Sequence, residues 1–340
     1  ARRAAADTAT PARVRFRALP EGDRAGKFKA LDGISLDDAG WSEASNEWRA
    51  PFLPLGSANW TRYPALEDLF IYNGSGVMAG RTWVIAPDAQ SLKDRWARLV
   101  SEKDADRKAT LFHPHMNGDR TSIKIVREPL AGHAHPPVSV AGDSSSGLSP
   151  LRYGFRSFDR QWIIPDNRLI NRANPMLWAT HSGAQVYLTG LHAHAPTSGP
   201  VLTVSALIPD LHHYKGSFGG RAFPLWADAA ATRSNISPNL LAELSLTFGR
   251  EIAPEAVVAY IAAVAAHPGY LARFRTHLEQ PGLRIPLTAD SALFNEAVAI
   301  GREVIWLHAF GERFAEGRPP GAPLLQRQDR GACHRGPRRV

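Results

Sequence analysis

The residues best able to do chemistry lie between Leu151 and Asn174, where arginines are interleaved with aromatic side chains. This span holds five arginines against two acids, and the arginines are Arg152, Arg156, Arg160, Arg168 and Arg172. Guanidinium groups pair with phosphate oxygens and with the major-groove edge of guanine. The pattern therefore indicates a nucleic-acid surface. The competing interpretation is an ordinary strand–turn–strand unit whose arginines are solvated or paired.

A second candidate is the polar segment from His212 to Arg221, which follows a predicted strand at residues 201–208. His212, His213, Tyr214 and Lys215 come directly before a glycine-rich stretch. A flexible, polar loop with an aromatic tip at the edge of a sheet suits contact with bases or with a sugar–phosphate backbone. An ordinary surface loop explains the same residues.

Signals for catalysis are weaker. Gly74, Gly76 and Gly80 have the spacing GxGxxxG with no strong helix after them, which favours a plain turn over a cofactor loop. Asp88 and Asp106 followed by Lys108 resemble a carboxylate pair with a lysine that could hold magnesium. Helix-surface charge is the simpler explanation. Histidine pairs such as His113/His115 have zinc-like spacing but lack nearby Asp, Glu or Cys. We therefore predict no metal or catalytic residue.

Composition restricts the class of protein. The length of 340 residues allows one large or two ordinary domains, and the net charge of +8 includes +5 contributed by the residues after Glu316. The only cysteine, Cys333, rules out a disulfide within one chain and favours a cytoplasmic protein. No apolar run is long enough to predict a membrane span, and the N-terminus lacks a secretory signal. Because the first residue is not methionine, we expect a part of a longer protein.

The elements predicted by periodicity and by helix caps give an α+β class, with a mixed, β-rich region followed by a C-terminal helical bundle. We expect strands near residues 82–85, 123–126, 162–164, 185–188 and 201–207. A helix is expected over 90–108, and four more begin near Pro238, Pro254, Pro268 and Asp290. The predicted organisation is a disordered start (1–11), an N-terminal α+β part (12–128), a Pro/Gly/Ser-rich linker (129–150), a β-rich core with the helical bundle (151–316) and a disordered, Arg-rich tail (317–340).

The stretch LRYGFRSFDRQWIIPDNRLINRANPMLW at 151–178 resembles the signature of the C-terminal target-recognition region of Type ISP restriction–modification enzymes. Residues 155–163 match that signature with Ser157 in place of proline and Gln161 in place of arginine, and residues 171–175 align with its second element. SALIPDLHHYKGSFGGRAFPLW at 205–226 is also similar. The resemblance covers roughly residues 12–316, and the tail after Gly317 looks unlike the family.

The resemblance implies sequence-specific recognition of a DNA target for a restriction–modification DNA methyltransferase involved in bacterial defence. Family members also carry a nuclease, a motor and an adenine methyltransferase, so S-adenosylmethionine is expected on the methyltransferase module and no cofactor on this chain. The expected partners are double-stranded DNA and that module, in cis or in trans, and no membrane. We expect no catalysis by this chain alone. The alternatives are a nuclease or methyltransferase fragment with a divergent active site, and a protein-interaction module that does not bind DNA.

The arginine stretch, the polar loop and the resemblance together predict the DNA-binding residues. The phosphates would be neutralised by Arg156, Arg160, Arg168, Arg172 and Lys215, and base edges would be reached by some of Arg152, Asn171, Asn174, His212, His213 and Arg221. We further expect the arginines between 151 and 172 to line one open groove. The predicted residues are Arg152, Arg156, Arg160, Arg168, Asn171, Arg172, Asn174, His212, His213, Tyr214, Lys215 and Arg221.

Overall fold

The computed structural model describes residues 13–44, 58–113, 120–191, 199–214, 219–278, 282–319 and 321–322. The chain forms two compact units, Ala1–Tyr63 and Pro64–Val340, which are described separately. Helices and antiparallel sheets are both present, which confirms the α+β class. The finer boundaries suggested by the sequence remain predictions. The expected disordered start and almost all of the expected disordered tail lie outside the described residues.

The first unit contains a short strand pair and a basic helix. β1 (Arg15–Phe16) pairs antiparallel with β2 (Ser42–Glu43). α1 (Arg24–Asp32) is capped by Asp23, whose carboxylate accepts a hydrogen bond from the backbone N–H of Gly26 at 2.8 Å. α2 (Ala58–Arg62) lies near the end of the unit. No residue of α1 is buried, so its cap and local contacts must hold it.

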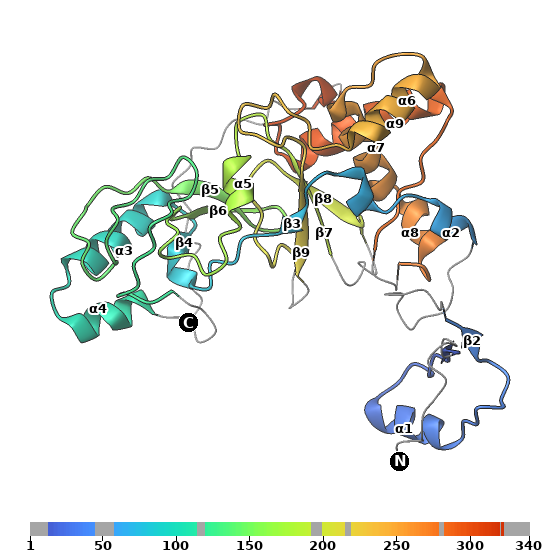
Figure 1. The fold of residues 1–340 in the computed structure, drawn as a ribbon, viewed down its shortest axis with the longest axis horizontal. Coiled ribbons are helices and arrows are strands. Elements are labelled where there is room, and N and C mark those ends of the chain that lie inside the picture. The colour runs from blue at the N-terminus through green and yellow to red at the C-terminus, as the bar shows by residue number, and fades with distance from the viewer. Residues whose placement is uncertain are drawn as a thin grey trace, which may run out of the picture. The chain divides into compact units, whose positions relative to one another are not determined.

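A four-stranded antiparallel sheet lies in the middle of the second unit (Figure 1). Its order is β3 (Gly74–Ser75), β9 (Gly220–Pro224), β7 (Tyr187–Leu191) and β8 (Leu202–Ser205). β7 and β8 are buried along almost their whole length, which explains why their sequences lack the alternation of a half-exposed strand. η1 (Leu66–Leu69) precedes the sheet.

A three-stranded antiparallel sheet and two helices lie at one end of this unit (Figure 1). The strand order is β4 (Ile85–Ala86), β6 (Asp159–Ile163) and β5 (Leu151–Arg156), with η2 (Thr82–Val84) before β4. The expected helix over 90–108 is two helices, α3 (Ala89–Ser101) and α4 (Ala105–Phe112). Asp104 starts the second by accepting from the N–H of Arg107 at 2.8 Å. Asp88 caps α3 by accepting a hydrogen bond from the backbone N–H of Ser91 at 2.7 Å.

Residues 123–126 and 129–150 are both irregular, although a strand was expected at 123–126. Residues 123–126 form no strand, and Ile123 is 76% exposed and Ile125 56% exposed. β-Branched residues favour a strand only where a neighbouring strand can pair with them. Residues 129–150 are irregular, as their composition predicts, yet Leu130 and Val140 are buried in the same core cluster as Tyr153 of β5.

The helices at the other end follow their sequence signals closely. α6 (Pro238–Phe248), α7 (Pro254–Ala266) and α8 (Pro268–Phe274) each begin with proline, and α9 (Ser291–His308) is capped by Asp290. α7 packs along α9, where a Cβ added at Gly301 would lie 1.7 Å from the carbonyl oxygen of Ala259. Glycine is therefore required at that crossing. α5 (Pro175–Ala179) and η3 (Ala315–Gly317) complete the described elements.

Across the described residues, no single helix is long and apolar enough to cross a membrane. α7 and α8 taken together pass that test by length and composition alone, with a bend of 65° between them.

Candidate nucleic-acid interface

An extended stretch that we call the central segment, residues 72–80, brings together several predicted binding residues. Gly74 and Ser75 pair with Ala222 and Arg221 in the sheet. Val77 forms a parallel bridge with Asp210, and Met78 forms an antiparallel bridge with Arg172. The backbone therefore places Arg172, the loop that starts at Asp210, and Arg221 along one short stretch of chain.

The glycines of the central segment permit this close approach. A Cβ at Gly76 would lie 2.5 Å from the carbonyl carbon and oxygen of Asp210. Gly80 has a φ of +73°, and a Cβ there would lie 2.2 Å from the side-chain nitrogen of Asn171. The spacing GxGxxxG thus serves backbone packing, and it is followed by the short η2 rather than by the helix that a phosphate-binding loop needs.

Asp210 is the main buried junction of the site and is 5% exposed. Its carboxylate accepts hydrogen bonds from the hydroxyl of Tyr153 at 2.8 Å, from Nη1 of Arg156 at 2.8 Å and from the backbone N–H of His212 at 2.7 Å. Burial raises the pKa of Asp210, and these donors counteract that effect in part. The carboxylate therefore joins strand β5 to the following loop and fixes the guanidinium of Arg156.

The loop after Asp210 is anchored on both sides. The carbonyl oxygen of His213 accepts from the backbone N–H of Ser157 at 2.8 Å, and Nε2 of His213 lies 2.9 Å from Oγ1 of Thr203. The hydroxyl of Tyr214 donates to the carbonyl oxygen of Thr189 at 2.9 Å. Burial lowers the pKa of His213 to about 4 and raises the pKa of Tyr214. Both side chains thus hold the loop to the sheet in their neutral forms. Lys215 lies outside the described residues.

Five of the predicted residues beside the central segment are exposed or half-buried. Arg172 is exposed and has no side-chain partner in the described part of the chain. Nε of Arg221 donates to Oδ1 of Asn73 at 2.7 Å and forms an ion pair with Glu67 at 3.3 Å. We call these five residues the central-segment cluster, and its members are Arg156, Arg172, Asn174, His212 and Arg221.

The side chain of Asn174 forms hydrogen bonds that stabilise the central segment. Its backbone is left-handed, with a φ of 46°, just before α5. Its side chain accepts from the hydroxyl of Tyr72 at 2.8 Å and donates to the carbonyl oxygen of Ser75 at 2.5 Å. Burial raises the pKa of Tyr72, so this hydroxyl remains a donor. Asn174 therefore braces the central segment with the same amide that we expected to contact bases.

The structure contradicts the expected phosphate contact of Arg168. The residue is 2% exposed, with Nη2 at 2.6 Å from Asp166 and Nη1 at 2.8 Å from Asp143. Burial opposes its charge, but the two carboxylates outweigh that effect and raise the pKa of Arg168. Its guanidinium stabilises the junction between the 129–150 stretch and the core and cannot reach a DNA backbone.

Two further predicted residues are also buried. Asn171 is 9% exposed and accepts from Nη1 of Arg81 at 2.9 Å, and His213 is 3% exposed. These side chains cannot contact a duplex in this conformation, so the expectation of direct contact is corrected to support of the central segment and of the loop.

Arg152 and Arg160 have other surroundings. The guanidinium of Arg152 lies 5.3 Å from the ring centroid of Trp162, and that of Arg160 lies 4.9 Å from that of Phe310. Arg160 also pairs with Glu312 at 2.6 Å. Carboxylates thus hold Arg156, Arg160 and Arg168 at three different places. The five arginines do not line one open groove, which corrects that part of the sequence interpretation.

Sequence inspection missed the residues that organise the cluster, namely Asp210, Tyr72, Asn73 and Glu67. Asp210 lies within the family-like stretch 205–226 but is not a residue type that binds phosphate, and the contacts of all four depend on pairing between distant strands. The one available signal was the unusual Gly-Ser-Gly in an otherwise apolar stretch, because such glycines indicate a close approach of two backbones.

The residues considered for catalysis are used structurally. Asp88 caps α3, and hydrogen bonds from Ser91 lower the pKa of that carboxyl group. Asp106 lies in the first turn of α4, while Lys108 is buried and donates from Nζ to the carbonyl oxygen of Ala141 at 2.9 Å. Within the described ranges, no three His, Cys, Asp or Glu side chains lie together as a metal site would require.

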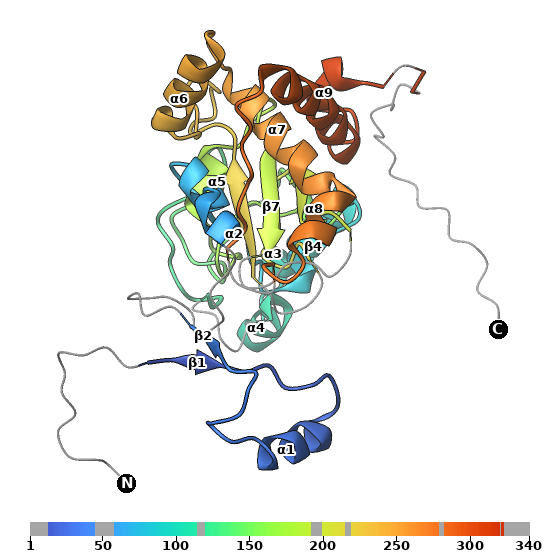
Figure 2. The same ribbon diagram turned by 90° about the vertical axis from the view of Figure 1, so that its right-hand side faces the viewer.

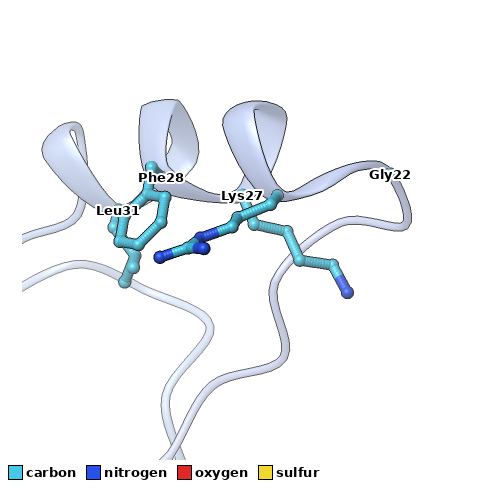
Figure 3. A pocket seen from close by; sticks show the side chains of 5 residues that line it. Gly22, Lys27, Phe28 and Leu31 are labelled. Carbon is cyan, nitrogen blue, oxygen red and sulfur yellow. The ribbon is translucent and has the colours of Figure 1, made fainter.

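A shallow pocket occurs beside α1 in the first unit (Figure 3). It measures about 360 Å³ and is lined by Gly22, Arg24, Lys27, Phe28 and Leu31. The guanidinium of Arg24 lies 5.4 Å from the ring centroid of Phe28. The lining combines cations with apolar side chains and contains no acid, but no further feature there indicates a ligand.

Comparison with known proteins identifies the family. The profile of the Type ISP C-terminal specificity domain matches residues 68–336, and the chain belongs to this family. The match extends into the tail that we expected to differ. No curated protein matches the chain.

Solved structures share the fold. One is titled a cryo-EM structure of a DrdV–DNA complex (TM-score 0.55, 18% identity, 84% of this chain and 29% of that one). Another is the ATP-dependent Type ISP restriction–modification enzyme LlaBIII bound to DNA (TM-score 0.54, 14% identity, 87% of this chain and 20% of that one). This chain therefore spans less than a third of either protein.

Proposed function

We propose that this chain recognises a DNA target sequence as the specificity part of a larger restriction–modification enzyme. The observation that carries the proposal is the gathering of three arginines, an asparagine and a histidine along the central segment of a Type ISP specificity domain. The DNA complexes formed by DrdV and LlaBIII, which share the fold, support DNA as the ligand.

The binding residues would make two kinds of contact with DNA, one to phosphates and one to base edges. Arg172 and Arg221 are placed to neutralise phosphates and so to fix the position of the duplex. Asn174 and His212 carry the donors and acceptors that distinguish base edges. Asp210 holds Arg156 in one orientation, and Asn73 with Glu67 holds Arg221, so less side-chain entropy is lost when these arginines bind.

The remaining chemistry would belong to other modules. We infer that the target is presented to a methyltransferase module, in the same polypeptide or in a partner, and that this module binds S-adenosylmethionine. The family match supports a specificity role, and the side chains considered for catalysis on this chain act as caps and packing contacts.

The dependence of DNA affinity on salt tests the phosphate contacts. Fluorescence anisotropy with labelled duplexes would be measured at several salt concentrations for the 340-residue chain and for Arg172→Ala. Each lost phosphate contact lowers the slope of log affinity against log salt by about 0.9. Arg172→Ala should lower it by that amount for all duplexes alike. Arg98→Ala is the matched control, because Arg98 is also exposed but belongs to α3.

The outcomes separate the candidate functions. An unchanged slope in Arg172→Ala would contradict the phosphate role of Arg172. A chain that retains its fold but binds no duplex at low salt would favour the alternative, a protein-interaction module.

The proposed contact of Asn174 with a base should be tested with a variant that keeps the backbone conformation of residue 174. Asn174→Gly removes the side-chain amide and still permits the left-handed φ of 46°. We expect this variant to bind its preferred duplex and a mismatched duplex with more similar affinities than the unaltered chain does. An unaltered preference would show that Asn174 has only its bracing role.

A further inference from the structure

Helix α9 carries an apolar stripe on the side that faces away from α7. Leu293, Ile300 and Leu307 recur every seven residues and are 52%, 49% and 55% exposed. Residues seven apart lie on nearly the same side of a helix, as in one seam of a coiled coil. Figure 2 shows α9 beside α7 at the margin of the helical part. The inner side of α9, which includes Phe294, Gly301 and Ile305, is buried.

The stripe continues beyond the end of the helix. Phe310, three residues after Leu307, is 39% exposed. Phe158 at the β5–β6 turn is 47% exposed and packs against His308 of α9, with ring centroids 4.9 Å apart. At 1.5 Å per residue, Leu293 and Leu307 are about 21 Å apart along the axis of α9. That length corresponds to nearly four helical turns, and contiguous exposed apolar patches on soluble proteins commonly mark interaction sites.

The charged side chains that α9 itself carries on this side are of one sign, and the Arg160 guanidinium over the Phe310 ring is already paired with Glu312. Glu296 and Glu303 lie three residues after Leu293 and Ile300, both are exposed, and neither forms an ion pair with another described residue. The exposed positions of α9 include no lysine or arginine. Arg302 is turned aside, where it pairs with Glu316.

We propose that this stripe of Leu293, Glu296, Ile300, Glu303, Leu307 and Phe310 is the docking site of a basic amphipathic helix from outside this chain. Apolar side chains of the incoming helix would cover the leucines and isoleucine, and lysines or arginines on its flanks would face the two glutamates. α9 would then lie between α7 and its partner.

A second copy of this chain fits the stripe less well. If two α9 helices crossed antiparallel at Ile300, Glu296 of each copy would come close to Glu303 of the other. Four carboxylates with no compensating cation would then be brought together, which disfavours self-association. The same charges favour a cationic partner.

The test uses the 340-residue chain and two designed 21-residue helical peptides as probes. Both have leucine at the a and d positions, and their e and g positions are all lysine in one and all glutamate in the other. Anisotropy titrations should show that the lysine peptide binds at least about tenfold more tightly, a difference of about 1.4 kcal/mol. Ile300→Asp should weaken its binding by about tenfold or more. The double variant Glu296→Lys/Glu303→Lys should reverse the preference between the peptides.

Ile123→Asp is the matched control, because Ile123 is also exposed and lies outside α9. It should bind the lysine peptide as the unaltered chain does, and thermal melting should confirm that all variants are folded. Equal binding of the two peptides, or no effect of Ile300→Asp, would overturn the proposal. If the chain dimerises in sedimentation experiments and Ile300→Asp abolishes the dimer, the partner of the stripe is a second copy of this chain. That result would overturn the proposal of an external basic helix. DNA binding, measured in parallel, should be unaffected by Ile300→Asp, so the test is independent of the proposed function.

Discussion

Arg168 was expected from the sequence to contact DNA, but the structure buries it in a pair of carboxylates. The guanidinium is 2% exposed and touches Asp166 and Asp143 at 2.6 and 2.8 Å. Arg168→Ala would leave two buried carboxylates without their cation, and breaking a buried pair in this way costs about 3–5 kcal/mol. For a unit of this size, a loss of about 4 kcal/mol corresponds to a fall in Tm of about 12 °C.

Chemical and thermal unfolding would measure this loss. We expect a folded Arg168→Ala chain with a much lower urea midpoint and an unchanged salt slope for DNA binding, because the guanidinium does not reach the surface. The exposed Arg172 should behave in the opposite way, with nearly unchanged stability and a reduced slope. Arg168→Ala with unaltered stability and a reduced salt slope would refute the buried assignment.

The pH dependence of the same variant adds an independent check. Burial opposes the charge of Asp143, but hydrogen bonds from Ser145 and Arg168 outweigh it and lower the pKa of that carboxyl group. A lowered pKa contributes stability above the unfolded value near 3.8, and that contribution is lost as pH falls through the folded value. In Arg168→Ala the unpaired carboxylate should take up a proton more readily. The stability deficit of the variant should therefore shrink when the pH is lowered from 7 toward 4.

Three further predictions follow from particular contacts. Gly301→Ala should cost about 3 kcal/mol, because the helix backbone at Ala259 cannot yield, whereas Gly147→Ala, with open space around it, should be neutral in urea unfolding. The pKa of His213 is about 4, so its share of the unfolding free energy should fall as pH drops from about 6.5 to 4. His213→Gln should flatten that profile. Asp210→Asn should cost about 2 kcal/mol in the same assay, because hydrogen bonds from Arg156 and His212 are weakened. Equal effects of the two glycine changes would contradict the tight packing at Gly301. A pH profile unchanged by His213→Gln would contradict the lowered pKa of His213, and full stability of Asp210→Asn would contradict the role of the Asp210 hydrogen bonds.

The helical end of the fold could be predicted well from the sequence because its signals are local. Pro238, Pro254, Pro268 and Asp290 mark helix starts by their own backbone or side-chain chemistry, and the structure begins helices at these points. Strands were less predictable. Residues 123–126 have a suitable composition but no strand to pair with, and pairing is decided by distant parts of the chain.

The contacts of the candidate site were also hard to predict from the sequence, because they join distant parts of the chain. Composition located the arginines of residues 151–172 but could not say which carboxylate each one would meet. Arg168 meets Asp143, Arg156 meets Asp210, and Arg160 meets Glu312, and these acids come from three separate parts of the chain. The family resemblance was carried by local motifs and is confirmed. The division of the arginines between core and surface depends on tertiary packing.

Selection from a pool of randomised duplexes would measure whether this chain recognises a DNA sequence. The chain would be incubated with the pool at moderate salt, and the bound fraction would be sequenced. We expect one enriched target motif, which persists with Arg172→Ala and becomes degenerate with Asn174→Gly. Retention of duplexes with no enriched sequence would contradict the claim that this chain recognises a DNA target.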